Sequence, residues 1–551
     1  MTNAAVQFTY DQVPYPSLSH ASSHPDCLAT LARLVGMKPA AVDHCRVLEL
    51  GCGVGGNLIP LACALPDSKF TGIDLSGHQI EAGRQKITTL GLINIVLEQK
   101  DILDVGPEFG QFDYIVAHGV FSWVPPAVQE KVLEICRQNL APQGVAFVSY
   151  NTYPGWYMIN IARGIMRYYT RKITDPHQRA EEARSTLQWF SGASESDTNG
   201  YYGYLKMYVD YLFGRQDEDD HSPKEDSALL HDELEDINLP LYFYEFVDRA
   251  AGHGLQYLGE VEETIGGKKL TENLEYLRRA HPSLIDMEQS YDFLRNRTFR
   301  RTLLCHQEVV IDRKVTISRI AEFFISSGAR PVSDKPDIAG KSIEQFRIRN
   351  GATFSTDHPL SKAAMLCLRD SWPKPMKFEE LFNAALLRLE NEKRQQGDPS
   401  MEPPGEELRK GDDLRLLAAN LLKAFDYSNS LVELHTYDSS LCSQAGARPV
   451  ASQWAVLQAM EPDQKWVTNL RHERVQLDPF DRFLLIQLDG KKDRSDLLEI
   501  FLKGPVAEGV LTVEAEGKSL SDVEFRGLLA EEIETRLTWL AKAALIVNLP
   551  K

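Results

Sequence analysis

A glycine-rich segment and the acidic residues around it carry the clearest chemical signal in this sequence. In RVLELGCGVGGNLIP, residues 46–60, four glycines occupy six positions directly after an apolar run. Glycine lets backbone amides approach a ligand closely, and a helix that begins there adds a partial positive charge. Asp74 lies 23 residues after Gly51, where a carboxylate can accept hydrogen bonds from both hydroxyls of a ribose. This pattern suits two ligands, a dinucleotide or S-adenosylmethionine.

Two further residues, Glu49 and Asp101, distinguish these cofactors. Beside a pyrophosphate, the Glu49 carboxylate would bring two like charges together, whereas beside an ammonium and a sulfonium it is favourable. Asp101 can accept a hydrogen bond from an adenine amino group while Ile102 covers the ring; the alternatives are a capping aspartate and a solvated glutamate. Together these features favour S-adenosylmethionine. The predicted cofactor-binding residues are Glu49, Gly51, Cys52, Gly53, Gly55, Asp74, Leu75, Asp101, Ile102 and His118.

Alternating strand-like and helix-like segments must position these residues. The alternation predicts a doubly wound α/β fold, in which ligands bind beyond the carboxyl ends of parallel strands. The glycine segment, Asp74, Asp101 and His118 all lie at strand ends, so we expect them around one crevice. The predicted strands are residues 46–50, 70–76, 95–103, 112–119 and 144–152, and the predicted helices are 56–64, 77–91 and 126–140.

Aromatic residues near these strand ends predict a channel for the methyl acceptor. Methyl transfer from a sulfonium is an in-line displacement, so the protein mainly aligns the two partners and excludes water. A lysine acceptor must lose its proton, and aromatic rings hold ammonium groups by cation–π attraction. The aromatic candidates are Tyr10, Tyr15, Trp123, Tyr150, Tyr153 and Trp156, each of which could instead belong to the hydrophobic core.

Two of these candidates, Tyr10 and Tyr15, belong to the leader YDQVPYPSLSH, which we expect to fold over the donor as a lid. His118 also belongs to the catalytic candidates. A histidine at a strand end serves as often in a structural hydrogen bond as in catalysis, and we do not assign it as a general base. The predicted catalytic set is Tyr15, His118, Trp123, Tyr153 and Trp156.

Several motifs resemble known methyltransferases in order and spacing. VLELGCGVGGN, FTGIDLS, KDIL, FDYIVAHGVFSWVP and LAPQGVAFVSYNTYPGW resemble class I methyltransferases. YDQVPYPSLSHASSHPDCLATLARLVGM and HDELEDINLPLYFYEFVDRAAGHGLQYLGEVE resemble a bacterial group with a methyltransferase regulatory domain, which includes the rickettsial outer-membrane-protein lysine methyltransferases. Over residues 8–265, the resemblance implies that Gly51, Gly53 and Gly55 pack against the methionine portion and that residues 117–119 face the sulfonium.

The length of 551 residues predicts several domains. We predict a catalytic domain over residues 1–154 and 231–265, interrupted by a helical insertion over 155–230. In the insertion we expect two apolar stripes, and the resemblance implies a homodimer contact. A middle (regulatory) α+β domain over 266–390, a polar linker over 391–415 and a winged-helix-like, mainly α domain over 416–551 would follow. The stripes are Met158, Ala162, Ile165 and Tyr169, and Leu205, Tyr208, Val209 and Leu212.

Composition limits the partners. The net charge of −18 argues against nucleic-acid binding, as does the net charge of −7 over residues 401–551 (18 Lys and Arg against 25 Asp and Glu). The negative net charge suits a lysine-rich partner. Eight scattered cysteines with no CxxC pair predict no metal site and a cytoplasmic location. No apolar run is long enough for membrane insertion.

Three functions fit this sequence. The first is a protein-lysine methyltransferase that uses S-adenosylmethionine and releases S-adenosylhomocysteine. The second is a small-molecule or lipid methyltransferase with accessory docking domains. The third is a non-catalytic regulator that binds S-adenosylmethionine, and a competent residue at every donor-contact position speaks against it.

Overall fold

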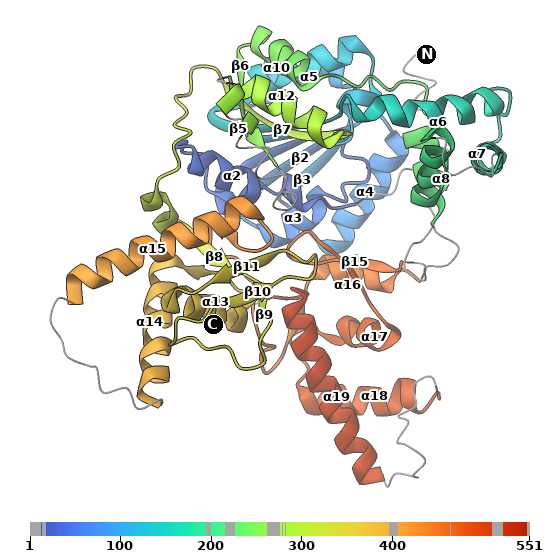
Figure 1. The fold of residues 1–551 in the computed structure, drawn as a ribbon. Helices are drawn as coiled ribbons and strands as arrows, with labels where there is room; N and C mark the ends of the chain where they lie inside the picture. Colours follow the sequence, from blue (N-terminus) through green and yellow to red (C-terminus); the bar gives the residue numbers. More distant parts are fainter. Residues whose placement is uncertain are drawn as a thin grey trace.

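The computed structural model describes most of the chain. The described residues are 13, 18–193, 200–214, 226–261, 276–277, 279–281, 283–395, 406–462, 464–509 and 522–547. Figure 1 shows a catalytic domain around a central sheet, with the middle domain (yellow to orange) and the C-terminal domain (orange to red) side by side against it. Both accessory domains contact helices that cover the sheet. Strand β13 (Glu433–His435) touches α2 (Pro25–Leu34), and α16 (Gln453–Met460) touches α3 (Leu58–Ala64).

The central sheet has seven strands in the order β3-β2-β1-β4-β5-β7-β6. Its first five strands are parallel, and β7 runs antiparallel between β5 and β6. This confirms the predicted class I methyltransferase fold, with all five predicted strands present. The strands are β1 Arg46–Leu50, β2 Lys69–Asp74, β3 Ile95–Gln99, β4 Phe112–Ala117, β5 Leu140–Asn151, β6 Leu255–Glu260 and β7 Phe299–His306.

Helices cover both faces of the sheet, as its apolar strands require. On one face, Leu58 and Ile80 pack from α3 and α4 together with Leu28 from α2. On the other face, Leu133 of α5 and Phe246 of α10 pack against the strands. The bounds of these helices are α2 Pro25–Leu34, α3 Leu58–Ala64, α4 Gly77–Leu90, α5 Pro126–Gln138 and α10 Phe243–Gly252.

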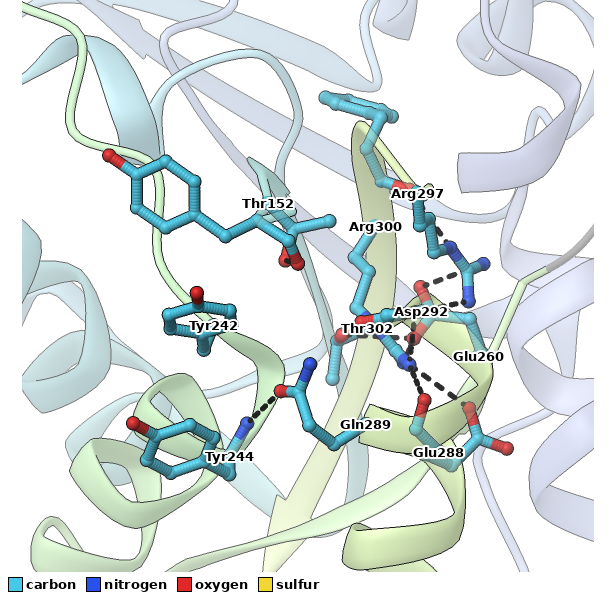
Figure 2. A network of polar contacts seen from close by, with 12 residues as sticks. Thr152, Tyr242, Tyr244, Glu260, Glu288, Gln289, Asp292, Arg297, Arg300 and Thr302 are labelled. Carbon is cyan, nitrogen blue, oxygen red and sulfur yellow. Dashed lines mark hydrogen bonds and ion pairs between the residues drawn. The ribbon is translucent and has the colours of Figure 1, made fainter. Parts of the chain in front are cut away.

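Strand β7 lies inside the catalytic sheet, although the sequence-based boundary at residue 265 assigned it to the middle domain. A buried charge network fixes it there (Figure 2). Arg300 on β7 is fully buried, and its guanidinium pairs with Asp292 at 2.8 Å and with Glu260 on β6 at 2.7 Å. Asp292 belongs to α12, Leu284–Arg295. A buried arginine must be paired, so the network ties α12 and β7 to the sheet.

The insertion forms a helical layer beside the sheet (Figure 1, teal and green). Its core buries Ala162 and Leu205, but Met158 and Tyr169 are 36% and 47% exposed. The predicted first stripe is therefore wrong at both ends, because Met166 and Ala162 define the face that α6 buries. The helices are α6 Gly155–Thr170, α7 Pro176–Ser191, α8 Gly200–Phe213 and α9 Asp226–Ala228, and a π-helical turn, Leu229–Glu233, follows.

The middle domain has its own core of α13, α14, α15 and short strands. Helix α15 begins inside the predicted linker and buries Leu417 and Leu421 in this core, so residues 416–427 lie with the middle domain rather than with the C-terminal one. The elements are β8 Phe324–Ser326, β9 Arg330–Pro331, β10 Glu344–Arg347, β11 Thr353–Thr356, α13 Pro359–Ser371, β12 Met376–Lys377, α14 Phe378–Gln395, α15 Glu406–Tyr427 and β13 Glu433–His435.

The C-terminal domain mixes short strands with helices around a separate core. Trp454 of α16 leaves that core and joins the core of the catalytic domain. Within the described ranges, no helix is long and apolar enough to cross a membrane. The elements are β14 Val450–Ala451, α16 Gln453–Met460, β15 Trp466–Thr468, β16 Arg474–Gln476, α17 Pro479–Gln487, α18 Arg494–Phe501, α19 Asp522–Lys542 and β17 Ile546–Val547.

A charged network joins the three domains next to the sheet. The Asp26 carboxylate of α2 pairs with Nδ1 of His435 at 2.8 Å. The Glu433 carboxylate, on the same strand as His435, accepts hydrogen bonds from both terminal nitrogens of Arg471 at 2.7 Å each. Burial alone would lower the pKa of His435, but hydrogen bonds to Asp26 and Glu433 outweigh it and raise the pKa to about 9. The junction therefore depends on a protonated histidine.

Candidate active site

A cavity of about 530 Å³ opens at the carboxyl ends of the parallel strands. It is the crevice that the strand-end residues predict. Residues from the leader, the sheet, the insertion and the start of β7 all line it. Of the predicted site residues, those that line the cavity are Glu49, Gly51, Cys52, Gly53, Asp74, Leu75, Asp101, Ile102, His118, Trp123 and Trp156.

The glycine loop requires glycine because of its backbone conformation and its close packing against neighbouring side chains. Gly51 has φ +74°, and a Cβ there would lie 2.5 Å from a methyl of Val120. Asp74 faces the loop, and its carboxylate accepts hydrogen bonds from Gly53 N and Ser76 N at 2.9 Å each. Gly55 does not line the cavity; a Cβ there would lie 3.0 Å from Leu97, so this glycine packs the loop against the core.

Glu49 is the most unusual group in the cavity. It is 4% exposed, and its Oε1 accepts a hydrogen bond from Asn57 Nδ2 at 2.9 Å. No donor from the described residues reaches its Oε2. Burial raises the pKa of Glu49 to about 8; the Asn57 hydrogen bond opposes this shift, and the charge of Asp74 adds to it. A buried carboxylate oxygen without a donor beside a cavity is a place for a cationic group of a ligand.

Asn57 is a functional residue that the sequence did not reveal. Besides its hydrogen bond to Glu49, Asn57 Nδ2 donates to the hydroxyl of Ser23 at 3.1 Å. Asn57 Oδ1 accepts a hydrogen bond from the backbone N of His20 at 3.0 Å. It directly precedes α3, so a polar residue after the glycine loop is the only signal that could have indicated it. Asn57 therefore connects the leader to the carboxylate that faces the ligand.

Asp101 and Ile102 are half-buried at the end of β3 and line the cavity together. Asp101 Oδ1 accepts a hydrogen bond from Leu103 N at 3.0 Å, so the residue caps a short 3₁₀ turn. The capping role and the ligand-facing position thus coexist, because a carboxylate has more than one lone pair to offer.

His118 lies in the cavity wall with its ring 3.8 Å from that of His20. Its Nδ1 is buried without a hydrogen-bond partner in the described part of the chain. Burial holds the pKa of His118 well below its usual value, and His20 adds to the shift. The imidazole is therefore neutral and a weak base near pH 7, in keeping with leaving it out of general-base catalysis.

The four aromatic candidates that the structure describes fall into three groups. Trp123 and Trp156 line the cavity with their rings edge to face, 6.0 Å apart. Tyr150 is instead in the core, stacked on Phe246 at 4.1 Å, because side chains alternate along β5 and Asn151 takes the cavity side. Tyr153 also lies outside the cavity lining. Its ring stacks on Tyr157 at 4.1 Å.

The other two aromatic candidates, Tyr10 and Tyr15, lie outside the described residues. The described part of the leader does reach the site: Leu18 and His20 line the cavity, and the backbone oxygen of Val13 accepts from His231 Nε2 at 2.5 Å.

The insertion supplies a wall that sequence reasoning missed. Tyr208 and Tyr211 of α8 and the π-helical turn with His231, Asp232 and Glu233 line the cavity. The Tyr208 hydroxyl donates to Glu233 at 2.9 Å. The sequence showed Tyr208 only as part of an apolar stripe, and π-helical turns often mark functional sites. The described lining holds five carboxyl groups and one lysine, Lys100; the acids are Glu49, Asp74, Asp101, Asp232 and Glu233.

Three protein families match parts of this chain. A methyltransferase domain matches residues 48–146, and the C-terminal winged helix domain of PKMT matches residues 447–545. A predicted methyltransferase regulatory domain matches residues 225–306, which include α10, β6, α12 and β7 rather than the middle domain. With the strand order and the cavity, these matches define a class I methyltransferase.

Similarity to a rickettsial protein establishes the family of this chain. The chain belongs to the same family as uncharacterized protein RP789 of Rickettsia prowazekii (strain Madrid E). It is 32% identical to RP789 over 536 residues, which cover 96% of this chain and 91% of the relative. The structure of PKMT2 from Rickettsia typhi is similar, with a TM-score of 0.81 and 27% identity over 97% of this chain and 100% of PKMT2. PKMT2 in complex with AdoHcy gives a TM-score of 0.80.

Proposed function

We propose that this methyltransferase moves the methyl group of S-adenosylmethionine to lysine side chains of a polypeptide. The observation that carries the proposal is the unpartnered Oε2 of Glu49 in a cavity that continues into an acidic and aromatic wall. The likeness to PKMT2, whose structure includes an AdoHcy complex, supports both the cofactor and the protein substrate.

The donor side of the cavity would hold S-adenosylmethionine. Glu49 offers its free oxygen to the ammonium, and the amides of the glycine loop approach the carboxylate. Asp74, oriented by Gly53 N and Ser76 N, faces the ribose, and Asp101 with Ile102 faces the adenine. The cofactor supplies an activated methyl group on a sulfonium, and no metal enters this scheme.

The acceptor side would align the amine. Trp123 and Trp156 offer ring faces and edges to an alkylammonium, while the Tyr208–Glu233 pair sets the negative potential of the wall. The amine attacks only when neutral, and its ordinary pKa is about 10.4. Because His118 is a weak base, the proton passes from the bound ammonium to solvent or to the carboxyl wall before the amine attacks. These rings then exclude water and keep the amine in line.

The test uses labelled S-adenosylmethionine with a bacterial lysate and with defined lysine peptides. We expect label in protein and, by mass spectrometry, one added methylene per transfer on lysine. Label confined to lipids or small metabolites would favour the second function, and binding of S-adenosylhomocysteine without any transfer would favour the regulator.

We also propose that the protein is a homodimer through its insertion. Large side chains on α6, α7 and α8 are solvent-exposed, Trp189 by 67% and Met207 by 59%. Exposed apolar surface of this kind is typical of an interface. Trp189→Glu with Met207→Glu should give monomers in light scattering. A dimer of unchanged strength would place the interface elsewhere.

Eight cysteines without a disulfide support a cytoplasmic location.

A further inference from the structure

A second cavity lies in the insertion, next to the acceptor side of the first. It has a volume of about 580 Å³ and lies against helix α6. Its lining holds four arginines and one carboxylate, in a chain whose net charge is −18. The lining residues are Asn160, Arg163, Gly164, Arg167, Tyr168, Thr170, Arg171, Ile173, Arg179 and Asp236.

Two arginines of this cavity, one buried and one half-buried, donate to backbone carbonyl oxygens. Arg163 is 4% exposed and donates to the backbone oxygens of Asp232 and Glu235. Arg179 donates to the backbone oxygen of Leu234 at 2.8 Å. Carbonyl oxygens satisfy these donors, and the carboxylates of Glu233, Glu235 and Asp236 offset the positive charges only from a distance. Burial, followed by repulsion from Arg167, lowers the pKa of Arg163 to about 10, and the charges of Glu233 and Glu235 oppose this shift.

The other two arginines are more accessible to solvent, since Arg167 is half-buried and Arg171 is exposed. Arg167 pairs with Asp236 at 2.6 Å, and its side chain is 36% exposed. Arg171 lies over the ring of Tyr168 at 3.9 Å, an arrangement that fixes the guanidinium plane. Planar guanidinium groups bind carboxylate and phosphate oxygens through paired hydrogen bonds. The cavity is thus built for an oxyanion.

Helix α6 links this cavity to the acceptor side. Trp156 and Ile159 line the first cavity, and Asn160, Arg163 and Arg167 line the second. From Ile159 to Arg167 the helix rises about 12 Å, a length that an extended polypeptide covers in three to four residues. The first cavity is lined by acids and the second by arginines, so the two select opposite charges on one bound chain.

We propose that the cavity lined by Arg163, Arg167, Arg171 and Arg179 binds the carboxylate of an acidic residue three to four positions from the target lysine. This inference rests on the proposed lysine methylation. It names the substrate class as a polypeptide in which lysine and acid lie within one extended segment. Arg167 and Arg171 are specificity-determining residues in this scheme, and the acidic side chain adds a carboxylate to a lining that holds four guanidinium groups and one carboxylate.

The test compares two peptides in the presence of S-adenosylhomocysteine. One carries Asp at positions three and four on both sides of a lysine, and the other carries Asn there. We expect the intact protein to bind the Asp peptide at least about tenfold more tightly. Arg167→Gln with Arg171→Gln should remove most of this preference by weakening the Asp peptide alone. Arg388→Gln is the matched control, because Arg388 pairs with Asp370 at 2.6 Å and is 34% exposed, far from the insertion.

Equal binding of the two peptides by the intact protein would overturn the inference without any variant. So would a preference that survives the double substitution as it survives Arg388→Gln. Competition by inorganic phosphate separates a free-anion site from a peptide site: calorimetric phosphate binding at the arginines with no Asp preference contradicts the proposal. Methylation of both peptides with equal kcat/KM leaves the proposed function standing while the inference fails. Charge-dependent binding without methylation would support the inference about the arginine cavity and contradict the proposed function.

Discussion

His472 of the C-terminal domain lies with its Nε2 2.9 Å from the backbone oxygen of Asn57, the residue whose side chain donates to Glu49. Two hydrogen bonds thus connect the winged helix domain to the carboxylate that faces the ligand. His472 is buried, and burial lowers its pKa to about 3, so its neutral ring donates to the carbonyl at all physiological pH values. The C-terminal domain therefore helps to position Asn57 and, through it, the Glu49 carboxyl group in the cavity.

Substitution of His472 should weaken cofactor binding from outside the cavity. His472 has φ 62°, a conformation that asparagine tolerates, so His472→Asn shortens the side chain without straining the backbone. Loss of one hydrogen bond, about 0.5–1.5 kcal/mol, predicts a roughly 2- to 10-fold weaker S-adenosylhomocysteine affinity by calorimetry. The control is Glu461→Gln, which removes another interdomain pair, with Lys86 at 3.1 Å, and should leave affinity unchanged. Equal effects of both variants would refute this link.

Cofactor binding should release a proton from Glu49. Its pKa of about 8 in the free protein means that the carboxyl group is mostly protonated at pH 7, and the ligand's ammonium stabilises the charged form. Affinity should rise with pH up to about 8, and calorimetry in buffers of different ionisation enthalpy should show proton release near pH 7. In Glu49→Gln, release should vanish and affinity fall by about 1.5–3 kcal/mol. Proton release that persists in the variant would point to another group.

The raised pKa of Glu49 also has a consequence for the free protein. An acid whose pKa is higher in the folded state adds stability that is present below its unfolded value, 4.5, and is lost as pH rises through about 8. Glu49→Gln should therefore flatten the fall in thermal midpoint over this interval. A saturating ligand should do the same for the intact protein.

Trp123 and Tyr153 form a matched pair for the acceptor channel. Trp123 lines the cavity against Trp156, whereas Tyr153 stacks on Tyr157 outside it. Trp123→Ala should lower kcat at least about tenfold with unchanged S-adenosylhomocysteine affinity, because a lost ring admits water and loosens the amine. Tyr153→Ala should leave both quantities near those of the intact protein. A larger loss of turnover in Tyr153→Ala than in Trp123→Ala would contradict the assigned channel.

The domain junction should weaken in alkaline solution. His435, with a pKa raised to about 9, contributes stability that is fully present below pH 6.5 and is lost as pH rises through 9. We expect the thermal midpoint to fall over this window, with a contribution on the order of 3 kcal/mol. His435→Gln should be less stable at pH 6.5 and show a flatter profile. His44→Gln, whose side chain is 68% exposed, serves as the control and should keep the fall.

Local features of this protein could be predicted from the sequence, and distant contacts could not. The glycine loop and Asp74 follow consecutive strands, so strand order alone brings them together. The contact between Asn57 and His472 spans 415 positions, and no local pattern encodes it. Tyr153 was placed in the channel because it follows β5, but the chain turns into α6 there and its ring leaves the cavity.

The position of β7 illustrates the same limit. Its sequence, FRRTLLCH, is interrupted by arginines that usually indicate an exposed strand, yet Arg300 is fully buried. Only the pairing with Asp292 and Glu260 makes that burial possible, and both partners come from other elements. Likewise, the spacing of Tyr208 placed it in an apolar stripe of a helix. That spacing did not indicate that the hydroxyl end of its side chain would reach the cavity.

The strand order of the central sheet has a consequence for biosynthesis. Strand β5 ends at Asn151 and its neighbour β7 begins at Phe299, so residues 152–298, 147 in number, are translated between the two. At about 5–20 residues per second, a ribosome takes roughly 7–30 s over this interval. Throughout it the apolar edge of β5 lacks the strand that later covers it, and exposed edges recruit other chains. The nascent polypeptide should therefore engage chaperones most strongly while the insertion is being synthesised, and release them once β7 has emerged.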